Sequence, residues 1–212
     1  MTAKLEEIMF NNKEFATRQP RIIGEEQFRK YAVMAPLIKT TDGIFLLFEK
    51  RTNQLRHHPG EICFPGGKLE PEESLQECAV RETMEELLVR RHQIDILGPG
   101  DVFLSPFNIM VHPFIGVIKD YQDTFSKDEV EEIIKVPLSF FHNQQPDHYE
   151  SRLISKRPED FPYEWIPGGE NYPWANGTYD IYFYKYENII IWGMTAHMIK
   201  SIVELIDEYN IC

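Results

Sequence analysis

The sequence has few cysteines and no long apolar run, and both absences exclude classes of protein. The three cysteines, Cys63, Cys78 and Cys212, show neither paired spacing nor a metal-ligand pattern, so we expect reduced thiols rather than disulfides or a zinc site. No segment approaches the ~20 consecutive apolar residues of a membrane span. The charged, amphipathic start of the chain is unlike a signal peptide. We therefore expect a cytoplasmic protein without a membrane partner.

Positive charge is also scarce, because 34 acidic residues face 22 basic ones and the net charge is -12. A chain of this charge lacks the basic surface of a general nucleic-acid binder, so no nucleic-acid partner is expected. The sequence contains no internal repeat and no serine nucleophile elbow. Gly66-Gly67-Lys68 lacks the spacing of a phosphate-binding Walker motif. An anionic small molecule is compatible with this composition only where cations gather locally.

The length and hydrophobic content bound the domain organisation. A chain of 212 residues that is 42% hydrophobic buries a sizeable core, and we expect one domain over residues 1–212. Within it, residues 1–30 form an expected N-terminal helical extension, with short helices at 4–15 and 25–30. Residues 143–179 form an expected insertion, rich in aromatic residues and proline, that is ordered and either covers the site or makes a dimer contact.

The hydrophobic pattern predicts alternating strands and helices, which is typical of an α/β fold. Tyr31–Lys39 and Gly43–Phe48 read as two strands joined by a tight turn at Asp42-Gly43, where glycine supplies a positive φ. The further strands are expected at 93–97, 110–118 and 180–186, and the further helices at 128–136, with one more turn through Phe141, and at 191–209.

An acidic helix after Gly67 organises the rest of the sequence. Ser74 is placed to cap its N-terminus, and Glu77 completes a capping box. At about 100° per residue, the carboxylates of Glu82, Glu85 and Glu86 share one face. All-oxygen ligands of this kind suit Mg²⁺ or Mn²⁺. The alternative is an ordinary solvated helix face, in which Glu77 and Arg81 form an i,i+4 ion pair.

The sequence motif that contains this helix favours the metal site over a solvated face. The stretch resembles the signature of the Nudix hydrolases, G-x5-E-x7-R-E-U-x-E-E-x-G-U with U a bulky aliphatic. The matching positions are Gly67, Glu73, Arg81, Glu82, Glu85, Glu86 and Val89. Thr83 stands where an aliphatic residue is usual, and Leu88 stands where a glycine usually ends the helix. Because leucine does not readily adopt a left-handed C-terminal cap, we expect the turn after Leu88 to be built differently.

A basic polar segment precedes the signature. It resembles the motif LLTxR(S/A)x3Rx3Gx3FPGG of the coenzyme A pyrophosphatase branch of the Nudix hydrolases. The matching positions are Leu47, Arg51, Arg56, Gly60, Phe64, Pro65, Gly66 and Gly67, and the departures are Phe48, Glu49 and Thr52. The alternative is that Arg51 and Arg56 balance nearby carboxylates.

The resemblance implies the Nudix fold, an α/β/α sandwich around a mixed sheet, and a metal-dependent hydrolysis. By resemblance, Glu82, Glu85 and Glu86 hold Mg²⁺ or Mn²⁺, and Arg81 orients them. Later carboxylates in this family join metal binding or act as the base, so Glu129, Glu131 and Glu132 compete with Glu85 for that role. The residues expected to contact substrate are Arg51, Arg56, Gly66, Gly67 and Lys68.

The implied reaction is cleavage of the pyrophosphate of coenzyme A or acyl-coenzyme A into adenosine 3′,5′-bisphosphate and (acyl-)4′-phosphopantetheine. One alternative is a Nudix hydrolase of another nucleoside diphosphate, such as ADP-ribose or a dinucleotide. A second is a non-catalytic nucleotide sensor, which the retention of every signature glutamate disfavours. A homodimer is compatible with the aromatic insertion.

Overall fold

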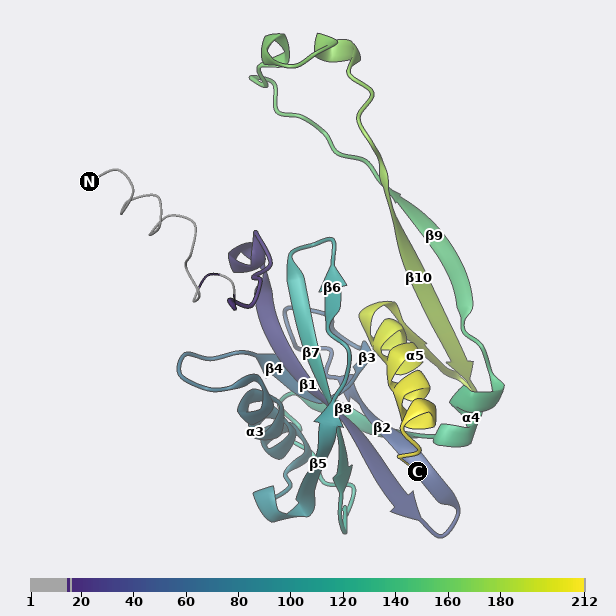
Figure 1. Cartoon of the computed structure of the whole chain (residues 1–212). Coiled ribbons are helices and arrows are strands. Elements are labelled where there is room, and N and C mark those ends of the chain that lie inside the picture. Colours follow the sequence, from purple (N-terminus) through teal and green to yellow (C-terminus); the bar gives the residue numbers. More distant parts are fainter. Residues whose placement is uncertain (1–14, 16, 212) are drawn as a thin grey trace, which may run out of the picture.

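The computed structural model describes Phe15 and residues 17–211, so the helix expected at 4–15 lies outside the described residues apart from its last position. The described chain forms a mixed sheet covered by helices on both faces, with a long hairpin projecting from one end (Figure 1). None of the described helices is both long and apolar enough to cross a membrane.

The central sheet has eight strands among the described residues. They are β1 (Arg29–Thr40), β2 (Gly43–Arg51), β3 (Ile62–Cys63), β4 (Gly66–Lys68), β5 (Ile94–Pro99), β6 (Phe103–Ser105), β7 (Ile109–Ile118) and β8 (Val130–Pro137). Their order is β3-β2-β1-β7-β5, with β4 paired to β1, β6 to β7 and β8 to β2. β1 and β7 run parallel, whereas their other pairings are antiparallel, so the sheet is mixed as expected.

The helices and a second, three-stranded sheet complete the fold. The helices are α3 (Leu75–Leu87), α4 (Leu138–Asn143) and α5 (Gly193–Glu208), with short 3-10 turns η1 (Glu25–Gln27), η2 (Arg91–Gln93), η3 (Tyr163–Trp165) and η4 (Gly169–Asn171). The second sheet has the order β11-β10-β9, from β9 (Asp147–Leu153), β10 (Gly177–Tyr186) and β11 (Ile189–Trp192).

Alternation along β2 divides the core into two layers. Leu46 and Phe48 are fully buried in the cluster that includes α5, whereas Leu47 is fully buried in the cluster beneath α3. Successive side chains of a strand point to opposite faces, so this one strand contributes to both layers. The architecture is the predicted α/β/α sandwich, with α3 and α5 on opposite faces of the sheet (Figure 1).

The start of α3 is as predicted, but its end is not. The Glu77 N–H donates to Ser74 Oγ at 3.2 Å, and the Ser74 N–H donates to Glu77 Oε2 at 2.8 Å. At the other end Leu88 does adopt the left-handed conformation, with φ 53° and ψ 40°, so our expectation was wrong. The loop after β7 supports this end, because Ser126 N–H and Thr124 Oγ1 donate to the carbonyls of the last helical turn.

Two helices expected from the sequence are strands or turns. The stretch predicted as a helix at 128–136 is β8, which pairs with β2. Its Val130, Ile133 and Ile134 have the spacing of a helix face, but Ile133 and Ile134 pack on opposite faces of the sheet. In the stretch 25–30, only η1 is helical and β1 already begins at Arg29.

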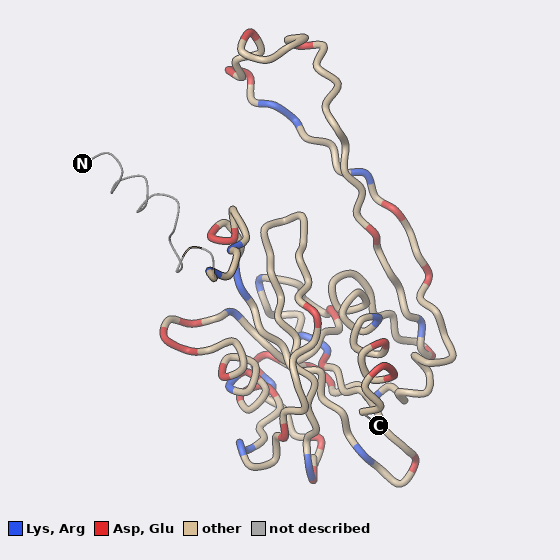
Figure 2. Tube along the Cα trace, viewed as in Figure 1, with Lys and Arg blue, Asp and Glu red and all other residues tan. Residues whose placement is uncertain are grey.

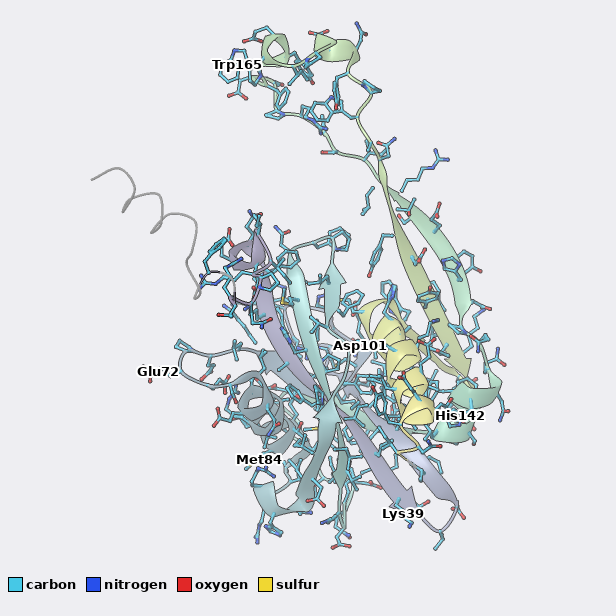
Figure 3. The ribbon with its side chains drawn as sticks, in the orientation of Figure 1. Lys39, Glu72, Met84, Asp101, His142 and Trp165 are labelled. Carbon is cyan, nitrogen blue, oxygen red and sulfur yellow. The ribbon has the colours of Figure 1, made fainter. Side chains whose placement is uncertain are left out.

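The aromatic and proline-rich stretch 143–179 is built as an arm. It contributes β9, which pairs over its whole length with β10, and the tip carries η3 and η4. The arm projects beyond the rest of the fold, and Trp165 lies at its far end (Figures 1 and 3). The strand expected at 180–186 is therefore longer, and the helix expected at 191–209 begins at Gly193, after β11.

Candidate active site

Two glycines allow β4 to pack closely against both β1 and α3. The Gly66 N–H donates to Glu86 Oε2 at 2.8 Å. Gly66 has φ 155°, and a Cβ there would lie 2.5 Å from Val33 Cα. A Cβ on Gly67 would lie 2.1 Å from Glu82 Oε1. Both positions exclude side chains, because atoms at such distances overlap, and this packing fixes Glu82 and Glu86 against β4.

Two carboxylates are buried side by side beneath α3. Glu86 is 2% exposed, and Glu49 of β2 is fully buried. Burial raises the pKa of Glu86 well above its ordinary value, and the charge of Glu49 raises it further. Burial likewise raises the pKa of Glu49, although Arg51 opposes the shift. Buried like charges are costly, so this pair is short of positive charge.

Glu49 was not among the site residues predicted from the sequence, where it figured only as a departure from the motif. Its Oε2 is buried and has no hydrogen-bond partner among the described residues, while Cys63 Sγ lies 3.6 Å from Oε1. The signal was the period of β2, because Glu49 shares a sheet face with the buried Leu47. A carboxylate at an inward position of an apolar strand marks a buried charge that needs a partner.

Arg81 holds the outer carboxylates in place. Its guanidinium donates to both oxygens of Glu73, at 3.1 and 2.9 Å, to Glu82 Oε1 at 2.9 Å and to Glu85 Oε2 at 3.3 Å. The hydrogen bond from Arg81 lowers the pKa of Glu73 to about 2. Arg81 therefore orients glutamates, as expected. Figure 2 shows acidic residues along α3 and the loop before it.

The predicted ligands differ in their surroundings. Glu82 lies against β4 and its side chain is 16% exposed, whereas the side chain of Glu85 is 61% exposed. Burial raises the pKa of Glu82, and Arg81 opposes that shift. Glu82 and Glu86 thus line the buried side of the site with Glu49, and Glu85 stands at its solvent edge.

The structure separates the three later candidates for the base. The charge of Glu129 contributes to raising the pKa values of Glu49, Glu82 and Glu86, so Glu129 lies near the cluster. By contrast, Glu131 accepts hydrogen bonds from Lys50 at 2.8 Å and Asn53 at 2.9 Å.

Glu132, the third candidate, is exposed on β8. The position of Glu129 follows from the loop that supports α3, since the Glu129 N–H lies 3.3 Å from the Ser126 carbonyl.

The predicted substrate contacts fall into two groups. Arg56 and Lys68 are exposed, and neither forms an ion pair within the described ranges. The Arg51 side chain instead lies beside Glu49, and its buried Nε has no hydrogen-bond partner there. The sequence left open the alternative that these arginines balance nearby carboxylates. That role fits Arg51, but not Arg56.

The residues present fit a divalent cation. The donors are all carboxylate oxygens, which Mg²⁺ and Mn²⁺ prefer, and one of them, Glu49 Oε2, is buried without a partner. In the part of the chain that the structure describes, no three acidic, histidine or cysteine side chains yet converge on one ion position. One reason is visible, because Arg81 holds an oxygen of Glu82.

Comparisons with known proteins agree with this geometry. A family model described as the NUDIX domain matches residues 28–169. The mouse peroxisomal coenzyme A diphosphatase NUDT7 is 31% identical over 134 residues, which make up 62% of this chain and 56% of the mouse protein. This chain therefore matches little more than half the length of that relative.

A longer match covers most of both chains. The Nudix hydrolase NudL of Yersinia enterocolitica, described as uncharacterized, is 30% identical over 182 residues, 83% of this chain and 80% of that protein. Among solved structures, a MutT/nudix family protein from Enterococcus faecalis superposes with a TM-score of 0.51 at 15% identity, over 98% of this chain and 75% of the other. The last match shows a shared fold. The chain belongs to the NUDIX family and is a Nudix hydrolase.

Proposed function

We propose that this Nudix hydrolase cleaves the pyrophosphate of coenzyme A or an acyl-coenzyme A, releasing adenosine 3′,5′-bisphosphate and (acyl-)4′-phosphopantetheine. The observation that carries the proposal is the junction of two motifs. The segment resembling the coenzyme A motif leaves β2 at Arg51 and returns through Gly66 and Gly67 to the glutamates of α3. The mouse relative named as a coenzyme A diphosphatase supports the same substrate.

Nudix hydrolases generally use divalent metal ions, and Mg²⁺ or Mn²⁺ is the ion proposed for this chain. Glu82 and Glu86 would hold it with Glu49, and Glu85 would join from the solvent edge. A bound divalent cation neutralises phosphate oxygens and makes water more acidic. The buried carboxylates contribute negative charge that a bound cation would stabilise in their deprotonated form.

The chain's own residues carry the remaining steps. Glu129 accepts the proton of the attacking water, because it is exposed and its charge acts on Glu86, whereas its competitor Glu85 is held by Arg81. Arg81 keeps Glu82 and Glu85 oriented through its hydrogen bonds. The oxyanion that leaves phosphorus is the phosphate of the departing product, so no acid with a perturbed pKa is required at the leaving group.

Recognition of the substrate falls to the exposed cations. Lys68 directly follows the glycines of β4, and Arg56 lies in the loop between β2 and β3; neither has a competing ion pair in the described part of the chain. Guanidinium and ammonium groups bind phosphate oxygens, including the 3′-phosphate that separates coenzyme A from ADP-ribose. Arg51 is assigned to balancing Glu49 instead. A cytosolic location stays a prediction from the cysteine pattern.

A substrate panel tests the proposal. The purified chain is incubated in Mg²⁺ or Mn²⁺ with coenzyme A, acetyl-coenzyme A, ADP-ribose and a dinucleotide, and the products are identified by mass spectrometry. We expect the highest kcat/KM for a coenzyme A species, with adenosine 3′,5′-bisphosphate as product. Equal turnover of ADP-ribose would support a broader nucleoside diphosphate hydrolase. Binding of coenzyme A without any phosphate product would contradict catalysis and support a sensor.

A matched variant sharpens this test. Arg56→Ala should raise the KM for coenzyme A about 10-fold, because a charge-assisted hydrogen bond to the 3′-phosphate is worth roughly 1.5–3 kcal/mol. The KM for ADP-ribose should change less. Arg21→Ala, at an exposed arginine before η1, serves as the control for loss of one positive charge. Equal effects of Arg56→Ala on both substrates would contradict the role assigned to this side chain.

A further inference from the structure

The arm ends the second sheet with an uncovered strand. In the order β11-β10-β9, β9 is the edge, and five of its seven residues are exposed. An edge strand presents a row of backbone N–H and C=O groups that pair readily with another strand. Proteins usually protect such edges with charged side chains, proline, bulges or a covering segment. The strand from Asp147 to Leu153 contains no proline, and its seven pairs with β10 run without a register shift.

Two charged side chains of β9 are not satisfied within their own hairpin. Glu150 lies opposite Asp180 of β10, so the pairing places like charges together. Asp180 is instead bound by His148 Nε2 at 2.9 Å. Arg152 lies opposite the neutral Thr178. Neither Glu150 nor Arg152 forms an ion pair within the described ranges, although each is exposed.

From these observations we propose that two copies of this chain form a homodimer in which their β9 strands pair antiparallel about Ser151. With Ser151 on the two-fold axis, Glu150 of each copy lies opposite Arg152 of the other. Tyr149, which is 60% exposed, then lies opposite Leu153. Opposite charges and apolar pairs directly across a ladder each stabilise it.

Neighbouring registers are less favourable. An axis at Glu150 would place that carboxylate opposite its own copy, and an axis at Arg152 would do the same with two guanidiniums. Like charges directly opposite destabilise a ladder. Of these three registers, only the one centred on Ser151 pairs the acid of each copy with the arginine of the other.

The same pairing places the tip of each arm against the other copy. Because the paired strands run in opposite directions, the tip of each arm extends past the base of the other copy's β9, towards α4. The tip exposes apolar surface that its own chain leaves open, with Ile154 at 76% and Trp165 at 80% exposure. With the axis at Ser151, only the five residues from Tyr149 to Leu153 of each β9 pair with each other, and this pairing alone buries little. Stable interfaces bury about 1,200–2,000 Å² in total, so the tip supplies the remaining area.

Charge reversal tests both the dimer and its register. The full chain and the variants E150R, R152E and E150R/R152E are compared by size-exclusion chromatography with light scattering. We expect a dimer for the natural chain, a rise of more than about 10-fold in the dimer dissociation constant for each single variant, and recovery in the double variant. E150R also replaces the like-charge pair with Asp180 by an opposite-charge pair within the same hairpin. This variant therefore strengthens the arm of each monomer.

A control separates this effect from net charge. Glu26→Arg makes the same change at an exposed position of η1, away from the arm and α4, and should leave the dimer intact. A monomeric natural chain would overturn the proposal. So would dimers that persist in both single variants, or single variants that dissociate without rescue by the double variant. Hydrolysis is measured alongside, and its presence or absence decides the proposed function independently of the oligomeric state.

Discussion

The glutamate cluster and the arm each contain groups that their own chain leaves unsatisfied, but of opposite kinds. Beneath α3, Glu49 and Glu86 are buried charges that lack sufficient positive charge. On the arm, Trp165 and the edge of β9 are exposed groups that lack cover. A buried carboxylate is stabilised by a cation, because its charge is otherwise uncompensated in the protein interior. An exposed apolar edge calls for a large surface, which only another chain supplies.

The two regions also differ in what stabilises them. The cluster is held by close packing on Gly66 and Gly67 and by the hydrogen bonds of Arg81. The arm is held by the strand ladder between β9 and β10 and by contacts within its tip, such as Arg157 over the Trp174 ring at 3.7 Å. Substitutions in the first region should change activity most, whereas substitutions in the second should leave activity and the core unchanged.

The largest expected effect is that of Glu86→Gln. It should lower kcat/KM by about 100-fold or more, since even the loss of a group behind a metal ligand costs about 10–100-fold. The melting temperature should stay the same or rise, because an amide still accepts the Gly66 N–H and relieves the repulsion with Glu49.

The matched control is Glu131→Gln. Glu131 is exposed and accepts a hydrogen bond from Lys50, so this variant should keep its activity. If Glu86→Gln unfolded the protein at a much lower temperature, the carboxylate would be structural, and the contrast between the two regions would fail.

A smaller effect is expected when the glycine packing is disturbed. Gly67→Ala places a methyl group where Glu82 Oε1 lies, so the carboxylate must move. We expect activity to fall about 10-fold or more and stability to fall by about 1–3 kcal/mol, as for other overpacked sites. Gly98→Ala, where nothing lies within 4 Å of the new Cβ, should change neither quantity. Denaturant unfolding and steady-state kinetics on both variants measure this difference, and equal behaviour would contradict the tight fit.

The pH dependence of stability should reveal the buried charge. Because the folded protein raises the pKa of Glu86 from 4.5 to about 9, it binds this proton more tightly than the unfolded chain does. Stability of the metal-free protein should therefore fall as the pH rises through that interval. Thermal melts over the interval should show the fall, and Glu86→Gln should reduce it, leaving the part that the raised pKa of Glu49 causes. Manganese should raise the melting temperature most at the alkaline end, and an unchanged profile in Glu86→Gln would point to other groups.

The smallest effect is expected on the arm. Trp165→Ala in the E150R background should leave the melting temperature of the monomer almost unchanged, because the ring is already 80% exposed. Exposed substitutions without special contacts usually change stability by about 0.5 kcal/mol or less. Hydrolysis should also be unchanged, as the tip lies far from the glutamates (Figure 3). A clear loss of activity would show that the arm reaches the site of its own copy.

Much of the sandwich was predictable because its signals are local. The capping box at Ser74 and Glu77 and the turn at Asp42-Gly43 depend on residues a few positions apart, and both form as expected. Glycine at position 43 has the positive φ that a tight turn requires. The ion pair of Arg81 with Glu73 is likewise set by the geometry of one loop and one helix.

The errors arose where tertiary structure overrides local pattern. Ile133 and Ile134 mimic a helix face, but pairing with β2 directs them to opposite faces of the sheet. Leu88 adopts a left-handed conformation because a distant loop satisfies the helix end. Glu49 was missed because it stands where the motif has threonine and so counted only as a departure from the motif. The fold shows that its side chain is fully buried beside Glu86.

The hydrogen bonds from Ser126 and Thr124 to the last turn of α3 link two segments that are distant in sequence. Any tilt of that helix must carry the start of β8 along, so the three glutamates and Glu129 shift as one rigid body. Replacing the Thr124 hydroxyl by a methyl group, as in Thr124→Val, should therefore speed amide hydrogen exchange at Ser126 and in α3 together. These two hydrogen bonds would then keep the distance between the proposed metal ion and Glu129 constant, although neither bond involves the ion or the Glu129 side chain.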